Sequence, residues 1–358
     1  MTDAPLQPAR LEDIAAKVGV SRSEVSRVIN GRIREGKSVG AATRERILQA
    51  AREMNYRPHA AAQSLARGRT DIVALMMVVD RQSHASPFSD SSAELSPHYH
   101  EIIGGLTYTL SQYGINLLLA QCGEGGADPN AVMERMARSR SFDGLIITDM
   151  RADDPRPATL DEIGLPYVVR GSSPHPGAVA VGMDNAAVGY EAVSYLHSLG
   201  HKRILFYNIG RDLMSGQRRY EGFCRAVEQF DLARTVEYCD DAHFADGVYH
   251  SLTQRLDHPN LPTAVFAEDE IGALGAERAL AAAGLRVPED VSIMTCLNAR
   301  FMRLVSPHLT VLNVRQNEVA SQAAHLMARI LRGEEVERRQ QFLSPLLEER
   351  GSTGAARR

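Results

Sequence analysis

The sequence predicts a small α-helical head followed by a larger α/β body of two doubly wound lobes. Apolar side chains recur at helical spacing through the first 54 residues, and from Asp71 onward apolar, strand-like runs alternate with helical patterns. Residues 1–70 carry 13 Lys and Arg against 7 Asp and Glu, whereas the other 288 residues carry 27 against 37. Although the net charge of the chain is −4, a basic head on an acidic body indicates a nucleic-acid-binding module joined to a domain of another kind.

Composition excludes several classes of protein. The N-terminus has no apolar stretch with a cleavage pattern, and the longest apolar run, Ile72–Val79, is far too short to cross a bilayer. No CxxC pair or histidine cluster has metal-ligand spacing, and the cysteines are isolated: Cys122, Cys224, Cys239 and Cys296. We therefore expect a cytoplasmic protein with reduced cysteines and with no metal, cofactor or membrane segment.

Apolar spacing and a cap mark the first two helices of the head. Apolar residues between Leu11 and Val18 fall on one face of a first helix, which Gly19 ends. The S-x-x-E sequence from Ser21 to Glu24 is a capping box that starts a second helix. The outer faces of this helix carry side chains suited to hydrogen bonding with bases and phosphates: Arg22, Ser23, Ser26, Arg27 and Asn30.

Two short helices, a glycine-containing turn and a polar second helix predict a helix-turn-helix. A third helix is expected from about Ala41 to Met54, with Ile47, Leu48 and Ala51 facing inward. A helical hairpin with a solvated charged face is the alternative interpretation. The basic charge of the head and the third helix favour DNA binding over that alternative.

Two stretches of the head, "LEDIAAKVGVSRSEVSRVING" and "TRERILQAAREMNYRPHAAAQSLARGRT", resemble the lactose/galactose-repressor (LacI/GalR) family, and the resemblance extends along nearly the whole chain. It implies that Arg22 and Ser23 read bases in the DNA. It also implies that Arg27 is the family's recurring base-contacting arginine and that Ser26 contacts the DNA backbone. Asn30 matches the asparagine that closes the recognition helix.

The head departs from the family pattern before its third helix. The loop that includes residues 32–38 is longer than usual, and it adds two arginines and a lysine. This loop is either a phosphate clamp or a plain solvated insertion. Gly40 replaces the usual serine cap, but glycine is an acceptable N-cap, so the third helix is still expected.

Residues 58–70 are expected to form a hinge helix and linker. The segment is Ala-rich with Pro58 near its first turn, and it is too short to be a stable helix alone. The resemblance implies that two copies enter the DNA minor groove, with Leu65 as the wedge that kinks the duplex and Ala62 in close contact. The alternative is that Leu65 packs on the following domain. His59 replaces the family's usual asparagine, which puts an N-cap there in doubt.

Repeated βα units predict the two lobes of the body. Strands are expected over Ile72–Val79, Ile115–Ala120, Leu145–Thr148, Arg203–Tyr207, Thr263–Ala267 and Val291–Thr295. Helices are expected over Tyr99–Tyr113, Pro129–Arg138, Gln217–Gln229 and Ile271–Ala283. Ligands bind such sheets at the carboxyl ends of the strands, which here meet in the cleft between the lobes. We find no phosphate loop, nucleophile elbow or HExxH motif, so we do not expect an enzyme.

Stretches such as "RRYEGF" and "PTAVFAEDEIGALGAERALAAAGLRVPEDVSIMT" resemble the family's periplasmic-binding-protein-like effector domain. The resemblance implies that Arg219 grips the effector and that Ser215 supplies a hydroxyl. A guanidinium suits vicinal hydroxyls or a carboxylate. The alternative for Arg219 is a surface salt bridge. His98 and Tyr99 stand where the family often has aromatic residues lining the cleft.

Two departures concern the effector site. Glu268-Asp269 replaces the usual Asn-Asp pair, and Leu297-Asn298 stands where an effector-binding aspartate is frequent. We hypothesise that Glu268 takes over hydroxyl recognition and pairs with Arg219 when the cleft is empty. The Ser-rich insertion at residues 81–96 is either a lid over the cleft or an uninvolved loop.

The sequence thus predicts a sequence-specific transcription regulator, repression being favoured, that binds a pseudo-palindromic double-stranded operator as a homodimer. Its domains are expected at residues 1–57 (helix-turn-helix), 58–70 (hinge), 71–350 (two-lobed effector and dimerisation domain) and 351–358 (tail). The expected effector is a sugar or sugar derivative. A purine-like or other non-sugar metabolite is the alternative, and a sugar-binding transport receptor is a more remote one.

Overall fold

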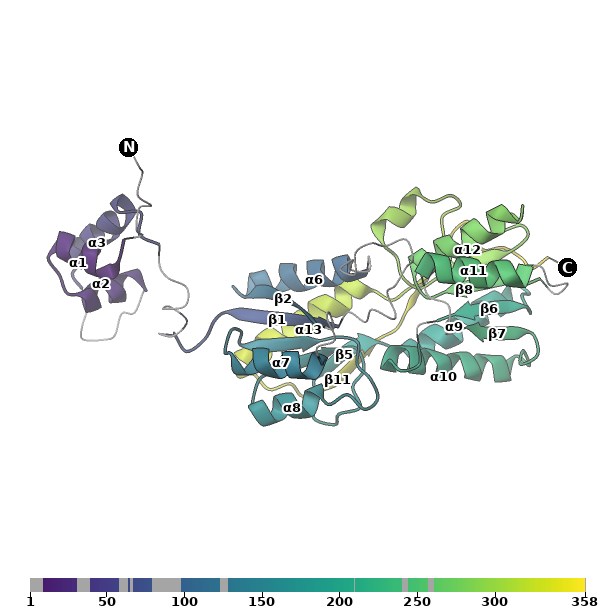
Figure 1. Cartoon of the computed structure of the whole chain (residues 1–358), viewed down its shortest axis with the longest axis horizontal. Coiled ribbons are helices and arrows are strands. Elements are labelled where there is room, and N and C mark those ends of the chain that lie inside the picture. Colours follow the sequence, from purple (N-terminus) through teal and green to yellow (C-terminus); the bar gives the residue numbers. More distant parts are fainter. Residues whose placement is uncertain are drawn as a thin grey trace. The chain divides into compact units, whose positions relative to one another are not determined.

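The computed structural model of the chain describes residues 9–30, 39–57, 64, 67–78, 98–122, 128–208, 210–239, 244–256 and 261–357. The chain divides into two compact units, Met1–Thr70 and Asp71–Arg358 (Figure 1). The described residues include no helix with the length and apolar character needed to span a membrane.

The first unit contains three short helices around one apolar core: α1 (Leu11–Val18), α2 (Arg22–Ile29) and α3 (Ala41–Glu53). Each helix contributes one side chain with no exposed surface, namely Ile14, Val25 and Ile47. The predicted helix-turn-helix with a third supporting helix is therefore confirmed. In α3 the second buried residue is Ala50, whereas the predicted Leu48 is only half-buried.

The sequence determines the turn between α1 and α2 locally. Gly19 adopts a left-handed conformation with φ of 74°, which a side chain would disfavour. The Glu24 amide donates to Ser21 Oγ at 3.2 Å, and the Ser21 amide donates to the Glu24 carboxylate at 2.9 Å. This is the predicted capping box.

Lobe one of the second unit contains a six-stranded parallel sheet in the order β11-β5-β4-β3-β1-β2. Its strands are β1 (Ile72–Val78), β2 (Asn116–Cys122), β3 (Gly144–Ile147), β4 (Tyr167–Arg170), β5 (Ala180–Met183) and β11 (Gln340–Leu343). Alternate residues along β1 pack on opposite layers. Val73 and Leu75 pack with α6 (His98–Gln112) and α13 (Gln316–Leu331), whereas Ala74 and Met76 pack on the side of α7 (Pro129–Arg138) and α8 (Arg156–Ile163).

Lobe two repeats this plan with the order β12-β10-β9-β8-β6-β7, in which only β12 is antiparallel. Its strands are β6 (Ile204–Tyr207), β7 (Val236–Cys239), β8 (Ala264–Ala267), β9 (Ser292–Thr295), β10 (Thr310–Asn313) and β12 (Leu346–Glu348). Helices α9 (Asn185–Ser198) and α10 (Met214–Gln229) cover one face, and α11 (Phe244–Leu256) and α12 (Glu270–Ala282) cover the other. A short 3-10 helix, η2 (Arg300–Leu304), follows β9. The predicted pair of doubly wound lobes is confirmed.

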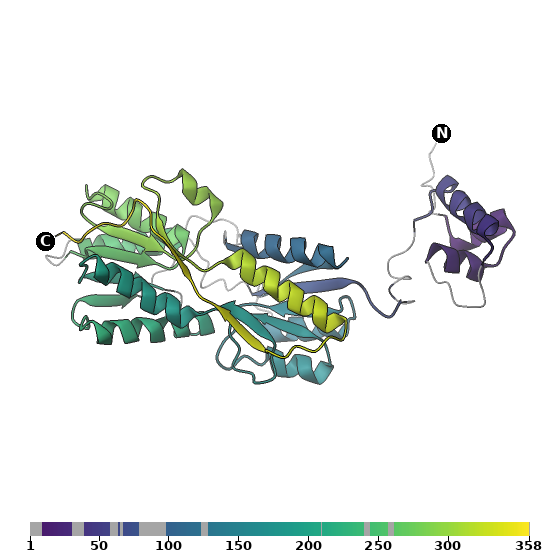
Figure 2. The same ribbon diagram turned by 180° about the vertical axis from the view of Figure 1, so that it is seen from behind.

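The chain crosses between the lobes three times, between β5 and α9, between β10 and α13, and between β11 and β12. Figure 2 shows α13 returning to lobe one, where it packs beside α6, and the last strands running back toward lobe two. The sequence patterns predicted two successive series of βα units. They missed this return because α13 carries small buried residues, such as Ala320 and Ala324, rather than a strong apolar stripe.

The described residues of the C-terminal tail, 351–357, pack on lobe two. Ser352 has no exposed surface. Its hydroxyl donates to the Ile293 carbonyl at 2.6 Å and accepts from the Thr310 amide at 2.8 Å. The C-terminal segment therefore links the inner strands β9 and β10.

Helices α9 and α10 approach each other through two glycines. A Cβ added at Gly222 would lie 1.9 Å from the Ala186 carbonyl oxygen, and one added at Gly189 would lie 2.0 Å from the Arg219 carbonyl oxygen. Both helices therefore depend on the absence of a side chain at these positions. This close approach brings Arg219 of α10 beside the N-terminus of α9.

Candidate functional site

The polar face of α2 is the first candidate site. Arg22 and Ser23 are exposed, while Ser26, Arg27 and Asn30 are partly exposed on the same side, opposite the buried Val25. Asn30 is the C-cap of α2, and its side-chain amide donates to Ser26 Oγ at 3.2 Å. The structure thus brings together all five residues predicted to contact DNA from this helix.

The arginines on this face already have partners within the unit. Arg22 Nε lies 2.7 Å from a Glu12 carboxylate oxygen of α1, and Arg27 Nε donates to the Ser23 carbonyl at 3.3 Å. Both Arg22 and Glu12 are well exposed, and such surface pairs contribute little to stability. Arg22 can therefore exchange its partner for a phosphate or a base at small cost.

Several predicted features lie outside the described residues. They are Ala62 and Leu65 of the hinge, the loop at residues 32–38, the insertion at residues 81–96 and the side chain of His98. Within the hinge, the Gly68 amide donates to the Ser64 carbonyl at 2.8 Å, which is the spacing of a helical turn.

Arg219 is the centre of a second candidate site, at the carboxyl ends of the strands of lobe two. Its side chain is 96% buried, since its relative exposure is 4%. One terminal nitrogen donates to Asn208 Oδ1 at 2.6 Å and lies 2.9 Å from a Glu268 carboxylate oxygen. The other donates to Asn185 Oδ1 at 2.8 Å. The surface salt bridge considered for Arg219 is therefore wrong.

The ion pair between Glu268 and Arg219 was expected from the sequence for an empty cleft. Burial opposes the charge of Arg219, but the carboxylate of Glu268 raises its pKa above the ordinary value. The guanidinium therefore stays charged and holds its partners in fixed positions. Its Nε is buried without a hydrogen-bond partner in the described structure.

Sequence reasoning missed the two asparagines that hold Arg219. Asn208 follows β6 and is 2% exposed, and its amide nitrogen also donates to the Tyr238 hydroxyl at 2.6 Å. Asn185 is the first residue of α9. The sequence shows that Asn185 directly follows Asp184, the N-cap of α9. It does not show that Asn185 contacts Arg219 of α10.

Lobe one contributes polar groups at the carboxyl ends of its own strands. The Tyr99 hydroxyl, in a side chain that is 6% exposed, donates to Asp149 Oδ2 at 2.7 Å, and Thr148 Oγ1 donates to the same oxygen at 2.7 Å. Burial, together with Asp149, raises the pKa of Tyr99 well above its ordinary value. Arg170 ends β4, and its Nε is buried without a hydrogen-bond partner in the described structure.

Ser215 and Asn298, two further predicted effector residues, lie in different surroundings. Ser215 is partly buried on α10, one turn before Arg219. Asn298 Oδ1 accepts from Arg350 at 3.0 Å, so this side chain is engaged with the C-terminal segment. Leu297 packs in the apolar core beneath α9 and α10.

Two further carboxyl groups follow Glu268 at the start of α12. Asp269 is the N-cap and accepts from the Gly272 amide. Burial raises the pKa of Asp269 to about 6, although that hydrogen bond opposes the shift. Burial, with Asp269, Glu101 and Glu268 nearby, raises the pKa of Glu270 to about 7.

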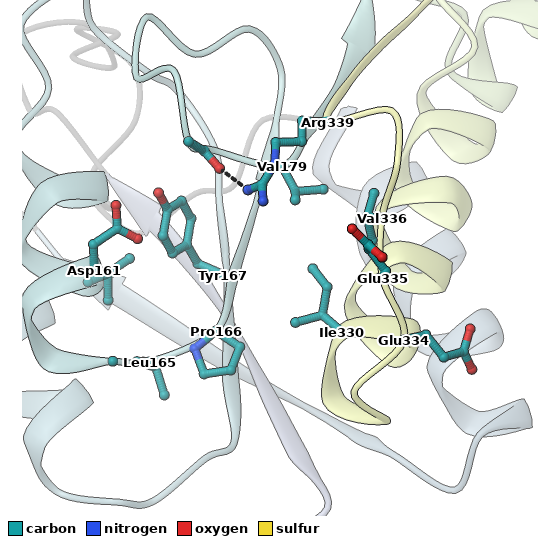
Figure 3. A pocket seen from close by; sticks show the side chains of 13 residues that line it. Asp161, Leu165, Pro166, Tyr167, Val179, Ile330, Glu334, Glu335, Val336 and Arg339 are labelled. Atoms are coloured by element: carbon teal, nitrogen blue, oxygen red, sulfur yellow. Dashed lines mark hydrogen bonds between the residues drawn. The ribbon is translucent and has the colours of Figure 1, made fainter.

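A separate pocket of about 410 Å³ lies at the opposite edge of the sheet in lobe one (Figure 3). Pro166, Val179 and Arg339 of its wall each precede a strand, whereas the effector candidates follow strands. Figure 3 shows the Tyr167 hydroxyl pointing toward Asp161. Burial and Asp161 raise the pKa of Tyr167 to about 12. No motif or apolar pattern in the sequence indicates this pocket.

Comparison with known proteins identifies the family. The model for bacterial regulatory proteins of the lacI family matches residues 10–59, and the model for a periplasmic binding protein-like domain matches residues 193–353. The HTH-type transcriptional regulator CelR of Thermobifida fusca is 33% identical over 336 residues, which cover 91% of this chain and 93% of that protein. The chain belongs to the lacI family. It is a DNA-binding transcriptional regulator with an effector-binding domain.

Other lacI-family relatives match along nearly the whole chain. The HTH-type transcriptional repressor CytR of Escherichia coli K12 is 28% identical over 97% of each chain. A solved complex of the transcriptional regulator CelR with cellobiose is 30% identical, with a TM-score of 0.67 and coverage of 96% of this chain and 99% of that one. The lac repressor dimer bound to operator and an anti-inducer shares the fold, with a TM-score of 0.82, 22% identity and coverage of 98% and 100%.

Proposed function

We propose that this lacI-family regulator binds a pseudo-palindromic operator as a homodimer and that a sugar or sugar derivative between its lobes controls DNA affinity. The assignment of the effector site is supported by the buried Arg219 and its contacts with Asn208, Asn185 and Glu268. A fixed guanidinium flanked by amide and carboxylate oxygens suits a ligand rich in hydroxyl groups. The cellobiose complex of CelR, a relative with this architecture, supports a sugar.

We also propose which part of the chain performs each role. Residues 1–57 read DNA through α2, and residues 58–70 form the hinge in which Ala62 and Leu65 meet the minor groove. The body from residue 71 binds the effector through Arg219, Glu268 and Ser215 in lobe two and through Tyr99 and His98 in lobe one, with Asn298 at the margin. The protein acts in the cytoplasm as a regulator and not as an enzyme, and repression is the favoured mode of regulation.

Replacing Arg27 with alanine tests the DNA-reading role of α2. We expect specific binding to weaken by about 1–3 kcal/mol and one base position to lose its preference, because an arginine read-out of a base edge is removed. Operator selection from random DNA, followed by titration of the selected site, measures both effects. The control is Arg52→Ala, which removes an exposed arginine of α3 that pairs with Glu45. An unchanged base preference in the Arg27 variant would contradict the assignment.

An exposed apolar surface supports the homodimer. Tyr108 of α6 is 70% exposed, Leu119 of the edge strand β2 is 44% exposed, and Leu304 of η2 is 88% exposed. In both views α6 and the light-green η2 lie along the same side of the two lobes (Figures 1 and 2). Exposed apolar side chains on elements that lie along one side of a protein are typical of an interface.

Leu304→Asp is therefore expected to shift the protein from dimer to monomer at micromolar concentration, since a charge at an apolar interface is costly to bury. The mass in solution, measured by light scattering, reports this shift. Leu346→Asp, at a 51% exposed leucine of β12, is the matched control. We expect a dimeric mass for the unmodified protein; a tetramer, or a dimer that the Leu304 change leaves intact, would refute the proposed interface.

A further inference from the structure

Glu270 is a buried acid without a partner. It is the first residue of α12, directly after the N-cap that follows β8. Its relative exposure is 1%, and neither carboxylate oxygen has a hydrogen-bond partner in the described structure. Buried carboxylates are almost always hydrogen-bonded or paired with a cation. Glu270 therefore lacks the group that would normally accompany it.

The charged groups around Glu270 come from both lobes, and most are acids. Glu268 and Asp269 precede it in lobe two, and Glu101 of α6, in lobe one, is close enough to raise its pKa. Cys296, which follows β9, lies in the same electrostatic environment, but burial raises its pKa to about 12, so it carries no charge. Arg219 acts on the adjacent Asp269, and it is already paired with Glu268.

Among the described residues, the arginines near the lobe-one acids do not supply the missing cation. Arg300 lies near Glu101, and Arg170 lies near Asp149 and Tyr99. Each of these arginines is thus accompanied by an acid of its own. The partial positive charge at the N-terminus of α12 favours Glu270, but Asp269 shares this favourable end. The place where Glu270 meets lobe one is left with an excess of negative charge.

Other buried polar atoms of the two lobes also lack partners in the described structure. The structure leaves Arg219 Nε, Arg170 Nε and both Glu270 oxygens buried without hydrogen bonds. Arg170 and Glu270 stand at or just after the carboxyl ends of strands, and the Arg219 guanidinium contacts Asn208 and Glu268, which follow strands β6 and β8. Ligands bind doubly wound sheets at this edge. Buried polar atoms without hydrogen-bond partners at such an edge indicate a ligand that supplies the missing hydrogen bonds.

We propose that the effector carries a positively charged amino group, which pairs with Glu270, on a hydroxyl-rich body held by Arg219 and Glu268. An amino sugar has this combination of groups. An ammonium supplies three donors to the unpartnered carboxylate and offsets the charge of the adjacent Asp269, whereas a neutral sugar leaves Glu270 uncompensated. The inference rests on the proposed effector function and specifies its ligand class.

Calorimetric titration of the full chain with matched sugar pairs tests the inference. The probes are glucosamine against glucose and galactosamine against galactose. We expect the protein to bind one amino sugar about 10- to 100-fold more tightly than its neutral counterpart, the range of a charge-assisted hydrogen bond. Glu270→Gln keeps the shape and removes the charge, so it is expected to abolish this preference. Glu277→Gln, two turns further along α12, is the control that should keep it.

Acidity gives a second readout. Between about pH 5.5 and about pH 7 an amino group stays charged while Glu270, with its pKa of about 7, gains charge. Affinity for the amino sugar should therefore rise over this range in the unmodified protein and stay flat in Glu270→Gln. The pKa of Glu270 is raised from 4.5 to about 7 in the folded protein. Its ionisation therefore destabilises the fold increasingly as the pH rises to about 7, and the full loss is present at pH 8. The same substitution should accordingly raise the melting temperature of the unliganded protein at pH 8.

Three results would overturn the inference. They are tighter binding of the neutral sugars, a preference for the amine that survives in Glu270→Gln, and no binding of either amino sugar at millimolar concentration. Operator binding by the same preparations is measured in parallel. If operator binding persists while the amine preference is absent, the ligand class is wrong and the regulator function stands. If operator binding is also absent, the proposed function itself fails.

Discussion

A protein in which Arg219 is replaced with methionine is expected to lose effector binding and a large part of the stability of lobe two. Removing one member of a buried ion pair leaves the other without compensation, which costs about 3–5 kcal/mol. Here Glu268 would lose its cation, and the Asn208 and Asn185 oxygens would lose their donor. Denaturant unfolding and calorimetric titration with the sugars measure the two losses.

Two companion variants separate stability from recognition. Arg218→Met removes the neighbouring arginine, which is 51% exposed and pairs with Glu221 at the surface. We expect it to change stability by less than about 1 kcal/mol and to leave ligand binding intact. The double variant Arg219→Met, Glu268→Gln should regain part of the lost stability, since no unpaired charge remains, without regaining ligand affinity. Normal effector binding by Arg219→Met would contradict its proposed role.

Gly222→Ala is expected to have the second large effect. The added methyl would lie 1.9 Å from the Ala186 carbonyl oxygen and 2.9 Å from the Tyr190 amide nitrogen, so α9 and α10 must separate. Overpacking typically lowers stability by about 1–3 kcal/mol. A clash with the backbone of a second helix is expected to cost at least as much as the upper end of this range. Because Asn185 begins α9 and Arg219 lies on α10, the separation should also weaken ligand binding.

A second glycine provides the matched control. Gly104 lies within α6, and a Cβ there would have no heavy atom within 4 Å. Gly104→Ala should therefore stabilise the protein by about 0.5–1 kcal/mol through helix propensity alone. Melting temperatures of the two alanine variants should move in opposite directions. If Gly222→Ala melts at or above the temperature of the unmodified protein, the helix contact is looser than the structure indicates.

Local signals in the sequence were sufficient for the head and for half of the body. The Ser21–Glu24 capping box and the left-handed Gly19 depend on residues a few positions apart, and both are present. Long apolar runs likewise predicted β1, β8 and β9 within one or two residues. The edge strand β7 was missed because it includes the exposed Glu237, which breaks the apolar pattern.

The candidate effector site could be predicted only in part. Arg219 and Glu268 came from the resemblance, and their pairing followed from opposite charge. Asn208 and Asn185 lie 11 and 34 residues from Arg219 in sequence, and no periodicity links residues that different elements bring together. The burial of Glu270 was equally invisible, because its neighbour Glu101 belongs to the other lobe.

The three crossings of the chain also determine the order in which the body can be completed during synthesis. Lobe one needs α13 and β11, which leave the ribosome only after nearly all of lobe two has been made. The small N-terminal unit is complete after the first 70 residues. A nascent or truncated chain therefore has a finished head well before either lobe can close its core. The regulatory part of the molecule is the last to form, and chains stopped before Gln316 have a head without a finished body to regulate it.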